Sequence, residues 1–178
     1  KKFKAIQTGG PSGGCLTEKH LDLPIEYDTL QAAGSMMGSG GMIVMDEDDC
    51  MVAMAQFYLG FTVEESCGKC SPCRIGNKRL FEILNKITSG KGTEEDLRKL
   101  RDLGQVIKDT SLCGLGQTSP NPVLSTLDNF YDEYVAHVTE QRCPAHQCRD
   151  LTVYYINPKK CTGCTLCAHV CPVHAIVG

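Results

Sequence analysis

The spacing of the cysteines constrains this chain more than any other feature of its sequence. Three cysteines stand at three-residue intervals in the segment Cys67-Gly68-Lys69-Cys70-Ser71-Pro72-Cys73, which is a C-x2-C-x2-C motif. At this spacing a turn of chain can wrap one corner of a cube, so that three thiolates converge on three different irons. The motif predicts a [4Fe–4S] cluster held by Cys67, Cys70, Cys73 and a fourth thiolate.

Cys113 is the best candidate for the fourth ligand. It lies in the glycine-rich segment 111–116, between two predicted helices. In an antiparallel helical bundle this loop would return to the end where the first motif lies. Cys50 is the alternative donor. A zinc site is the competing interpretation of the motif, but zinc sites usually consist of two C-x2-C pairs.

A second motif lies near the end of the sequence. Cys161, Cys164, Cys167 and Cys171 follow the pattern C-x2-C-x2-C-x3-C-P of bacterial ferredoxins. In two-cluster ferredoxins the last of these, here Cys171, binds the other cluster. Because no second run follows, we expect either a single-cluster variant or a sequence that ends within the domain, and we favour the latter.

A third group of sulfur and nitrogen donors lies between these motifs. The segment Cys143-Pro144-Ala145-His146-Gln147-Cys148 follows closely after His137. Four ligands for zinc could therefore come from His137, Cys143, His146 and Cys148. The alternative is a pair of free thiols beside a linker, and one ligand could instead come from Cys15 or Cys50.

The composition narrows the class of protein. The chain has 12 cysteines in 178 residues, and their short spacing beside helical patterns favours metal binding in a reducing cytoplasm over a disulfide framework. The net charge of −3 is spread over both signs, which argues against nucleic acid as a partner. No apolar run reaches the ~18 residues of a membrane span, and the N-terminus does not resemble a signal peptide.

The periodicity of apolar residues divides the chain into four parts. Residues 1–48 predict a small α+β unit, with strands over 3–7 and 41–45 and a helix over 28–33; we expect further strands upstream. Residues 49–140 predict a four-helix bundle, whose first helix covers about 50–61 and whose fourth covers 119–138. Residues 141–160 form a linker with a β-rich stretch over 151–156. Residues 161–178 begin a ferredoxin-like domain.

The sequence offers no catalytic residues. It contains no nucleophile with a base and no paired acid–base carboxylates. The glycine-rich segment 9–14 lacks the Lys-Ser/Thr of a phosphate-binding loop, so a structural turn is the better interpretation.

Three segments together resemble a known family. The segments 9–15, 65–74 and 111–114 are similar to the C-terminal half of the flavin-bearing, NADH-oxidising subunit of complex I. The resemblance is strongest to the versions in soluble, often electron-bifurcating, NAD(P)-linked [FeFe]-hydrogenases (their beta subunit) and formate dehydrogenases. Those versions carry an additional C-terminal ferredoxin domain, which the motif from Cys161 fits.

The resemblance implies a fold and a set of partners. Residues 1–48 would be part of a ubiquitin-like β-grasp domain, and residues 49–140 the four-helix cluster domain with Cys67, Cys70, Cys73 and Cys113 as ligands. FMN and the NAD(P) site would lie upstream, outside this chain. The implied partners in a cytoplasmic hetero-oligomer are a hydrogenase catalytic subunit, a small [2Fe–2S] thioredoxin-like subunit and ferredoxin.

The expected function is therefore an iron–sulfur electron relay within an NAD(P)-linked oxidoreductase. A subunit of an NAD-dependent formate dehydrogenase is an alternative of the same class. A zinc-binding structural module and an independent ferredoxin-like carrier are alternatives of other classes.

Overall fold

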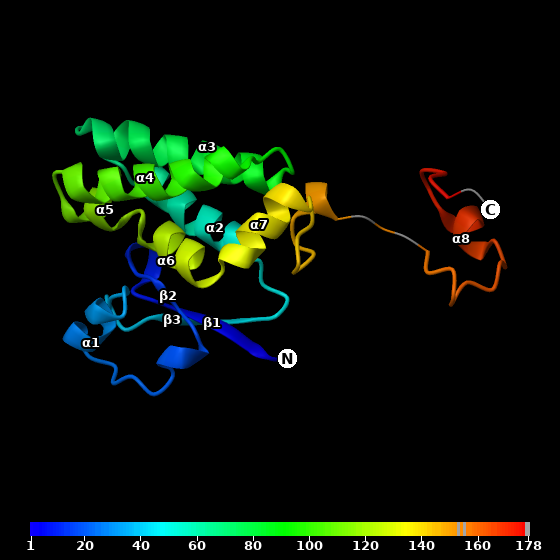
Figure 1. Ribbon diagram of the computed structural model, residues 1–178, viewed down its shortest axis with the longest axis horizontal. Helices are drawn as coiled ribbons and strands as arrows, with labels where there is room; N and C mark the ends of the chain where they lie inside the picture. The colour runs from blue at the N-terminus through cyan, green and yellow to red at the C-terminus, as the bar shows by residue number, and fades with distance from the viewer. Residues whose placement is uncertain (153, 155, 177–178) are drawn as a thin grey trace.

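The chain combines a small antiparallel sheet with a larger group of helices (Figure 1). The computed structural model describes residues 1–152, 154 and 156–176. The sheet has the strand order β2-β1-β3, with both pairs antiparallel. Its strands are β1 (Phe3–Thr8), β2 (Cys15–Leu16) and β3 (Met42–Asp46). The α+β class predicted from the sequence is confirmed.

The alternation of side chains along the strands determines which face of the sheet is buried. Ala5 on β1 and Met45 on β3 are paired in the sheet and both are buried. They form a small core with Cys15 and with Met51, the first residue of helix α2. The sheet is thereby attached to the start of α2.

The helices follow the predicted order along the chain. The α-helices are α1 (Tyr27–Ala32), α2 (Met51–Glu64), α3 (Asn77–Thr88), α4 (Glu94–Thr110), α5 (Gly114–Thr118), α6 (Asn121–Asn129), α7 (Tyr131–Thr139) and α8 (Leu166–Val170). Shorter turns are the π-helical η3 (Pro72–Gly76) and the 3-10 turns η1 (Gly10–Ser12), η2 (Glu18–His20) and η4 (Arg149–Leu151). The helices expected over 28–33 and 50–61 are confirmed as α1 and α2.

The prediction of one continuous fourth helix over 119–138 was wrong. The helix breaks at Phe130, whose backbone angles of −133° and 36° are not helical, and it continues as α7. Phe130 packs against the small core between the sheet and α2. The hydroxyl of the buried Tyr134 forms a hydrogen bond of 2.8 Å with Thr126 across the break. The apolar spacing therefore predicted the helical segments on both sides of Phe130 correctly. It did not predict the break between them, which results from tertiary packing.

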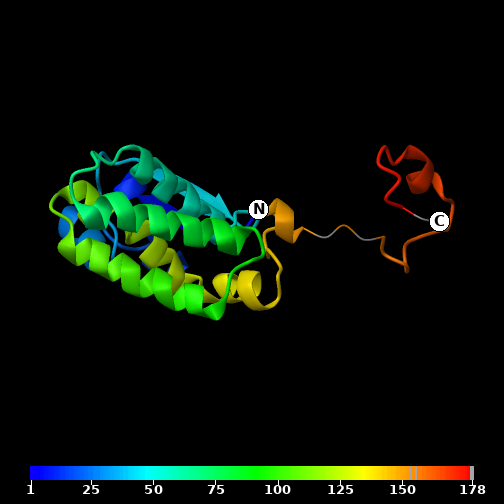
Figure 2. The ribbon, with the colours of Figure 1, turned by 90° about the horizontal axis from the view of Figure 1, so that it is seen from above.

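The main core lies between α2 and the helices that surround it. Helix α2 contacts α3, α6 and α7, while α3 and α4 run alongside each other (Figure 2). Fully buried apolar side chains from these helices meet there, and each stabilises the fold by roughly 1.5–3 kcal/mol through burial. They include Leu59, Leu80, Leu84, Leu100 and Leu127.

The C-terminal motif lies apart from these helices in both views (Figures 1 and 2). The β-rich stretch expected over 151–156 includes residues 153 and 155, which lie outside the described residues. Its first residue, Leu151, closes the turn η4 and is buried against the helices. Within the described residues, no helix has the length and apolarity needed to cross a lipid bilayer.

A capping box formed by Thr93 and Asp96 fixes the start of α4. The Asp96 carboxylate accepts hydrogen bonds from the Thr93 N–H (2.8 Å) and from Lys86 (2.5 Å), which lies on α3. Burial would raise the pKa of Asp96, but these two partners outweigh it and hold the pKa below its usual range.

Replacing Asp96 by asparagine should lower the free energy of unfolding by about 1 kcal/mol at neutral pH, as is usual for the loss of a cap. Because the folded-state pKa of Asp96 is depressed, its contribution is present above the unfolded pKa and disappears as the pH falls through the folded one. Urea unfolding at neutral and acidic pH measures both effects. An equal difference between Asp96→Asn and wild type at both pH values would contradict this assignment.

Candidate metal and cluster sites

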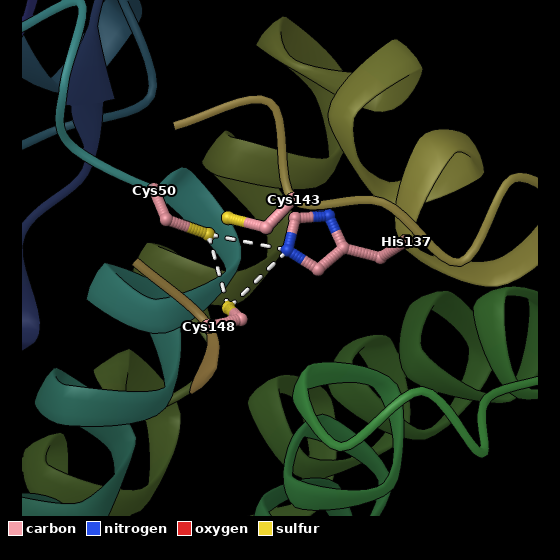
Figure 3. Close-up of side chains that lie close together, drawn as sticks. All are labelled: Cys50, His137, Cys143 and Cys148. Atoms are coloured by element: carbon pink, nitrogen blue, oxygen red, sulfur yellow. Dashed lines mark hydrogen bonds between the residues drawn. The ribbon is translucent and has the colours of Figure 1, made fainter. Parts of the chain in front are cut away.

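Four buried ligand atoms meet where α2 begins (Figure 3). Cys50, His137, Cys143 and Cys148 each offer one atom, and all four atoms lie within 4.8 Å of one another. Among the described residues this is the one group of such side chains compact enough to hold a single ion.

Three separate segments of the chain deliver these side chains. Cys50 is the N-cap of α2, and its sulfur accepts a hydrogen bond of 3.5 Å from the Ala53 N–H. His137 lies in the last turn of α7, and Cys143 and Cys148 lie in the loop that follows. Gln147, from the same loop, accepts a hydrogen bond of 3.1 Å from the Cys50 N–H. The loop is thereby fastened to the start of α2.

The separations among the ligand atoms of Cys50, His137 and Cys148 are close to those of a tetrahedral zinc site. Zn–S and Zn–N bonds of ~2.3 and ~2.05 Å imply S···S separations of about 3.8 Å and S···N separations of about 3.6 Å. The Cys50 and Cys148 sulfurs are 3.7 Å apart, and the Nε2 atom of His137 lies 3.3 and 3.4 Å from them. Three thiols and one imidazole are also a common donor set for structural zinc.

The surroundings orient His137 toward the sulfurs. Its Nδ1–H donates a hydrogen bond of 2.7 Å to the Glu133 carbonyl, so Nε2 is left to face the group. The Glu133 carboxylate is itself held by Lys4 at 2.6 Å and by the Met51 N–H at 3.2 Å. Glu133 on α7 therefore connects the His137 ring to the sheet through Lys4 and to α2 through Met51.

The protons held by the ligand side chains oppose the binding of a metal cation at low pH. The hydrogen bond with Cys50, together with burial, raises the pKa of Cys143 to about 12. Burial alone would lower the pKa of His137, but its contact with Cys50 raises that pKa to about 9. A bound metal must displace these protons, so its affinity decreases as the pH falls.

The structure corrects the predicted membership of this group. His137, Cys143 and Cys148 come together as expected, but Cys50 occupies the position that was predicted for His146. His146 has a positive φ of 56° in the turn after Cys143, and its side chain is exposed. Cys50 was one of the two alternative ligands expected from the sequence, and it lies 87 residues before His137 as the N-cap of α2. Cys15, the other alternative, is buried between the sheet and α2.

The C-x2-C-x2-C motif lies at the other end of α2. Cys67 follows the helix, whose 14 residues span about 21 Å. Cys50 is therefore excluded as the fourth ligand of the cluster motif. Gly68 adopts a positive φ of 76°, which only glycine tolerates readily, and the Arg74 guanidinium donates a hydrogen bond of 3.1 Å to the Gly68 carbonyl. This turn brings the chain from α2 into the π-helical η3.

The loop before α5 lies next to the motif. The backbone N–H groups of Leu112 and Cys73 lower the pKa of Cys70 below the usual value for a thiol. Gly116 on α5 lies so close to the motif that a Cβ atom there would be 3.1 Å from the Cys73 Cβ. Cys113 stands between these two contacts as the N-cap of α5.

One feature of this region fits a bound cluster. The Ser111 hydroxyl is buried and has no hydrogen-bond partner among the described residues. Such an orphaned donor, next to Cys73 and Gly116, is suited to a cluster sulfur.

The second cysteine motif forms a separate turn around α8. A hydrogen bond from the Leu166 N–H is the main cause that lowers the pKa of Cys164. A hydrogen bond from the Ala175 N–H is the main cause that lowers the pKa of Cys171. The sulfur of Cys171 accepts a hydrogen bond of 3.4 Å from the Ala175 N–H. Three cysteines of this motif are exposed to solvent, namely Cys161, Cys164 and Cys167.

Comparison with known families assigns both motifs to iron–sulfur regions. Residues 53–137 match the family described as the NADH-ubiquinone oxidoreductase-F iron-sulfur binding region. This range contains Cys67, Cys70, Cys73 and Cys113 and begins after Cys50. Residues 154–177 match the 4Fe-4S binding domain family, and this range contains the second cysteine motif.

Curated relatives match the chain over most or all of its length. It is 64% identical over 178 residues to the NADP-reducing hydrogenase subunit HndC of Solidesulfovibrio fructosivorans, covering 100% of this chain and 36% of that protein. It is 42% identical over 143 residues to the NADH-quinone oxidoreductase F subunit of Mycobacterium bovis, covering 80% of this chain and 32% of that protein. The chain therefore spans about a third of the length of these relatives.

A solved structure shares the fold. The crystal structure of an NAD+-reducing [NiFe]-hydrogenase in the air-oxidized state matches with a TM-score of 0.69 and 28% identity. The match covers 78% of this chain and 24% of that one. Family, sequence and fold agree that the chain is similar to the C-terminal, iron–sulfur-binding part of NADH-quinone oxidoreductase F-like and NADP-reducing hydrogenase HndC-like subunits.

Proposed function

We propose that this chain is the iron–sulfur electron-relay segment of a flavin-dependent NAD(P)H oxidoreductase subunit. The observation that carries the proposal is the meeting of two loops at one end of α2. The cysteine turn 67–73 and the segment 111–116 meet there, and the segment contributes the orphaned Ser111 hydroxyl. Cys67, Cys70, Cys73 and Cys113 would hold a [4Fe–4S] cluster, which supplies reversible one-electron transfer when bound.

The residues of this chain have a positioning role in that proposal. Cys73 is buried and Cys70 is half-buried, whereas Cys67 and Cys113 are exposed. The four cysteines therefore extend from the interior of the protein to its surface, where an electron donor or acceptor can approach. No described side chain needs to act as an acid or a base, because the chemistry of hydride transfer would belong to an FMN and a nicotinamide site outside this chain.

The second motif would extend the relay. Cys161, Cys164, Cys167 and Cys171 would bind a further [4Fe–4S] cluster, and their exposure suits electron exchange with another protein. We propose a hydrogenase, of the electron-bifurcating [FeFe] type, with its small [2Fe–2S] subunit and ferredoxin as partners. The similarity to the hydrogenase subunit HndC over the whole chain supports a hydrogenase over a formate dehydrogenase.

A structural zinc ion is the second part of the proposal. Cys50, His137, Cys143 and Cys148 would bind it, and the donor set together with the separations among Cys50, His137 and Cys148 supports that choice of metal. The ion would join the start of α2 to the loop that leads into residues 149–160. If the chain were instead a zinc-binding structural module only, it would contain zinc without iron or sulfide.

Replacing Cys113 by serine tests the relay proposal. The wild-type chain, prepared without oxygen, should contain iron and sulfide and give the electron paramagnetic resonance signals of reduced [4Fe–4S] clusters. Cys113→Ser should lose or strongly alter one of these signals while the other persists, because one thiolate is missing from one cluster. A matched Cys15→Ser variant, altered at a buried cysteine outside all three groups, should keep both signals. A colourless wild type that contains zinc alone would refute the relay.

A further inference from the structure

Asn77 is a buried polar residue that the relay proposal leaves without a role. It is the first residue of α3, one turn beyond Cys73, and its exposed fraction is 0%. Its Nδ2 atom lies 3.5 Å from the Cys73 sulfur, and its Oδ1 atom accepts a hydrogen bond of 2.7 Å from the Ser119 hydroxyl. The Ser119 side chain, also buried, lies 2.9 Å from the Gly116 carbonyl.

These contacts allow one orientation of the Asn77 amide when Cys73 is a thiolate. A thiolate accepts hydrogen bonds and cannot donate them, so the Nδ2 group must face the sulfur and the oxygen must face Ser119. In this orientation the single proton of the Ser119 hydroxyl is donated to the Asn77 oxygen rather than to the Gly116 carbonyl, and this bond holds the amide in place. The Ser119 hydroxyl thus donates to the Asn77 oxygen, and the Asn77 amide donates to the Cys73 sulfur.

The burial of Cys73 explains why such a donor matters at this ligand. Cys67 and Cys113 are exposed, so water can solvate their sulfurs, but Cys73 is only 4% exposed. Its hydrogen bonds must come from the protein, and in a low-dielectric interior they are stronger than in water. Besides Asn77, the Ser66 hydroxyl lies 3.3 Å from the same sulfur.

We infer that Asn77, oriented by Ser119, is a positioning residue that fixes the Cys73 thiolate and raises the reduction potential of the cluster bound through it. The inference rests on the proposed role of Cys73 as a cluster ligand. A hydrogen bond to a ligand sulfur stabilises negative charge, and a cluster gains one negative charge on reduction. The donor therefore favours the reduced form.

A redox titration of the full chain tests this inference. Cys164→Ser and Cys167→Ser form the background, so that the first cluster is observed alone by electron paramagnetic resonance. Asn77→Leu should raise the ratio of oxidised to reduced cluster at a fixed potential by about tenfold, which is a downward shift of ~59 mV for a one-electron couple. Ser119→Ala should shift the midpoint in the same direction by less. Asn85→Leu, at an exposed position on the same helix, should leave it unchanged.

The outcomes separate this inference from the relay itself. An unchanged midpoint in Asn77→Leu, with the iron content of the background chain, would overturn the role of Asn77. If Asn77→Leu does not fold or bind iron, Ser119→Ala decides, and an unchanged midpoint there overturns the inference equally. A background chain that contains no iron would instead refute Cys73 as a cluster ligand.

Discussion

Replacing Cys148 by serine should remove bound zinc from the chain and lower its free energy of unfolding by roughly 4 kcal/mol, because the loss of a metal is among the few changes that exceed the usual range for a point mutant. Cys148 is buried in the group at the start of α2, with its sulfur 3.7 Å from that of Cys50. A hydroxyl there is a poor zinc ligand. Elemental analysis of the purified chain and urea unfolding followed by circular dichroism measure the two effects.

His146→Asn provides the matched control for this prediction. His146 lies in the same loop as Cys148, but it is exposed and stands outside the group. Asparagine tolerates its positive φ of 56°, so the turn is preserved. The zinc content and the unfolding midpoint of this variant should match the wild type. Loss of zinc from His146→Asn, or its retention in Cys148→Ser, would show that the ligands differ from those in Figure 3.

Replacing Gly116 by alanine should reduce by more than half the iron bound at the first cysteine motif. A Cβ at this position would lie 2.6 Å from the Ser111 Cβ and Oγ, closer than real Cβ atoms approach their neighbours, and a tight 3.1 Å from the Cys73 Cβ. Either Ser111 or Cys73 must shift, and overpacking of this kind costs about 1–3 kcal/mol. Iron analysis in the Cys164→Ser, Cys167→Ser background measures the loss.

Gly114→Ala is the control for this second prediction. Gly114 lies two residues earlier on the same helix, next to Cys113, yet a Cβ there would meet no atom within 4 Å. Both substitutions raise helix propensity equally, so a difference between them reports the local contact alone. Equal iron contents in the two variants would show that packing of α5 against Cys73 and Ser111 does not affect iron binding.

The local motifs were the part of the site that could be predicted from the sequence. Ligands three residues apart belong to one turn of chain, so the groups at Cys67 and Cys161 could be recognised without knowledge of the fold. The same holds for the helices, because their apolar faces repeat within a single segment. The helix break at Phe130 could not be predicted, since it depends on the sheet and α2.

The partners of these motifs depended on the tertiary structure. The loop at 111–116 was expected near the first motif from bundle geometry, and its contacts with Cys70 and Cys73 follow that expectation. For the group proposed to bind zinc, nearness in sequence favoured His146, whereas the fold supplies Cys50.

The sequence by itself determined the class of fold, the chemistry of the ligands and the three places where they gather. Only the tertiary structure decided that Cys50 and Cys67 lie in different groups, at opposite ends of α2. The physical reason is that a metal or cluster selects ligands by distance in space. A rigid helix keeps its two ends about 21 Å apart, while chain folding brings Cys50 and His137, 87 residues apart in sequence, within 3.3 Å.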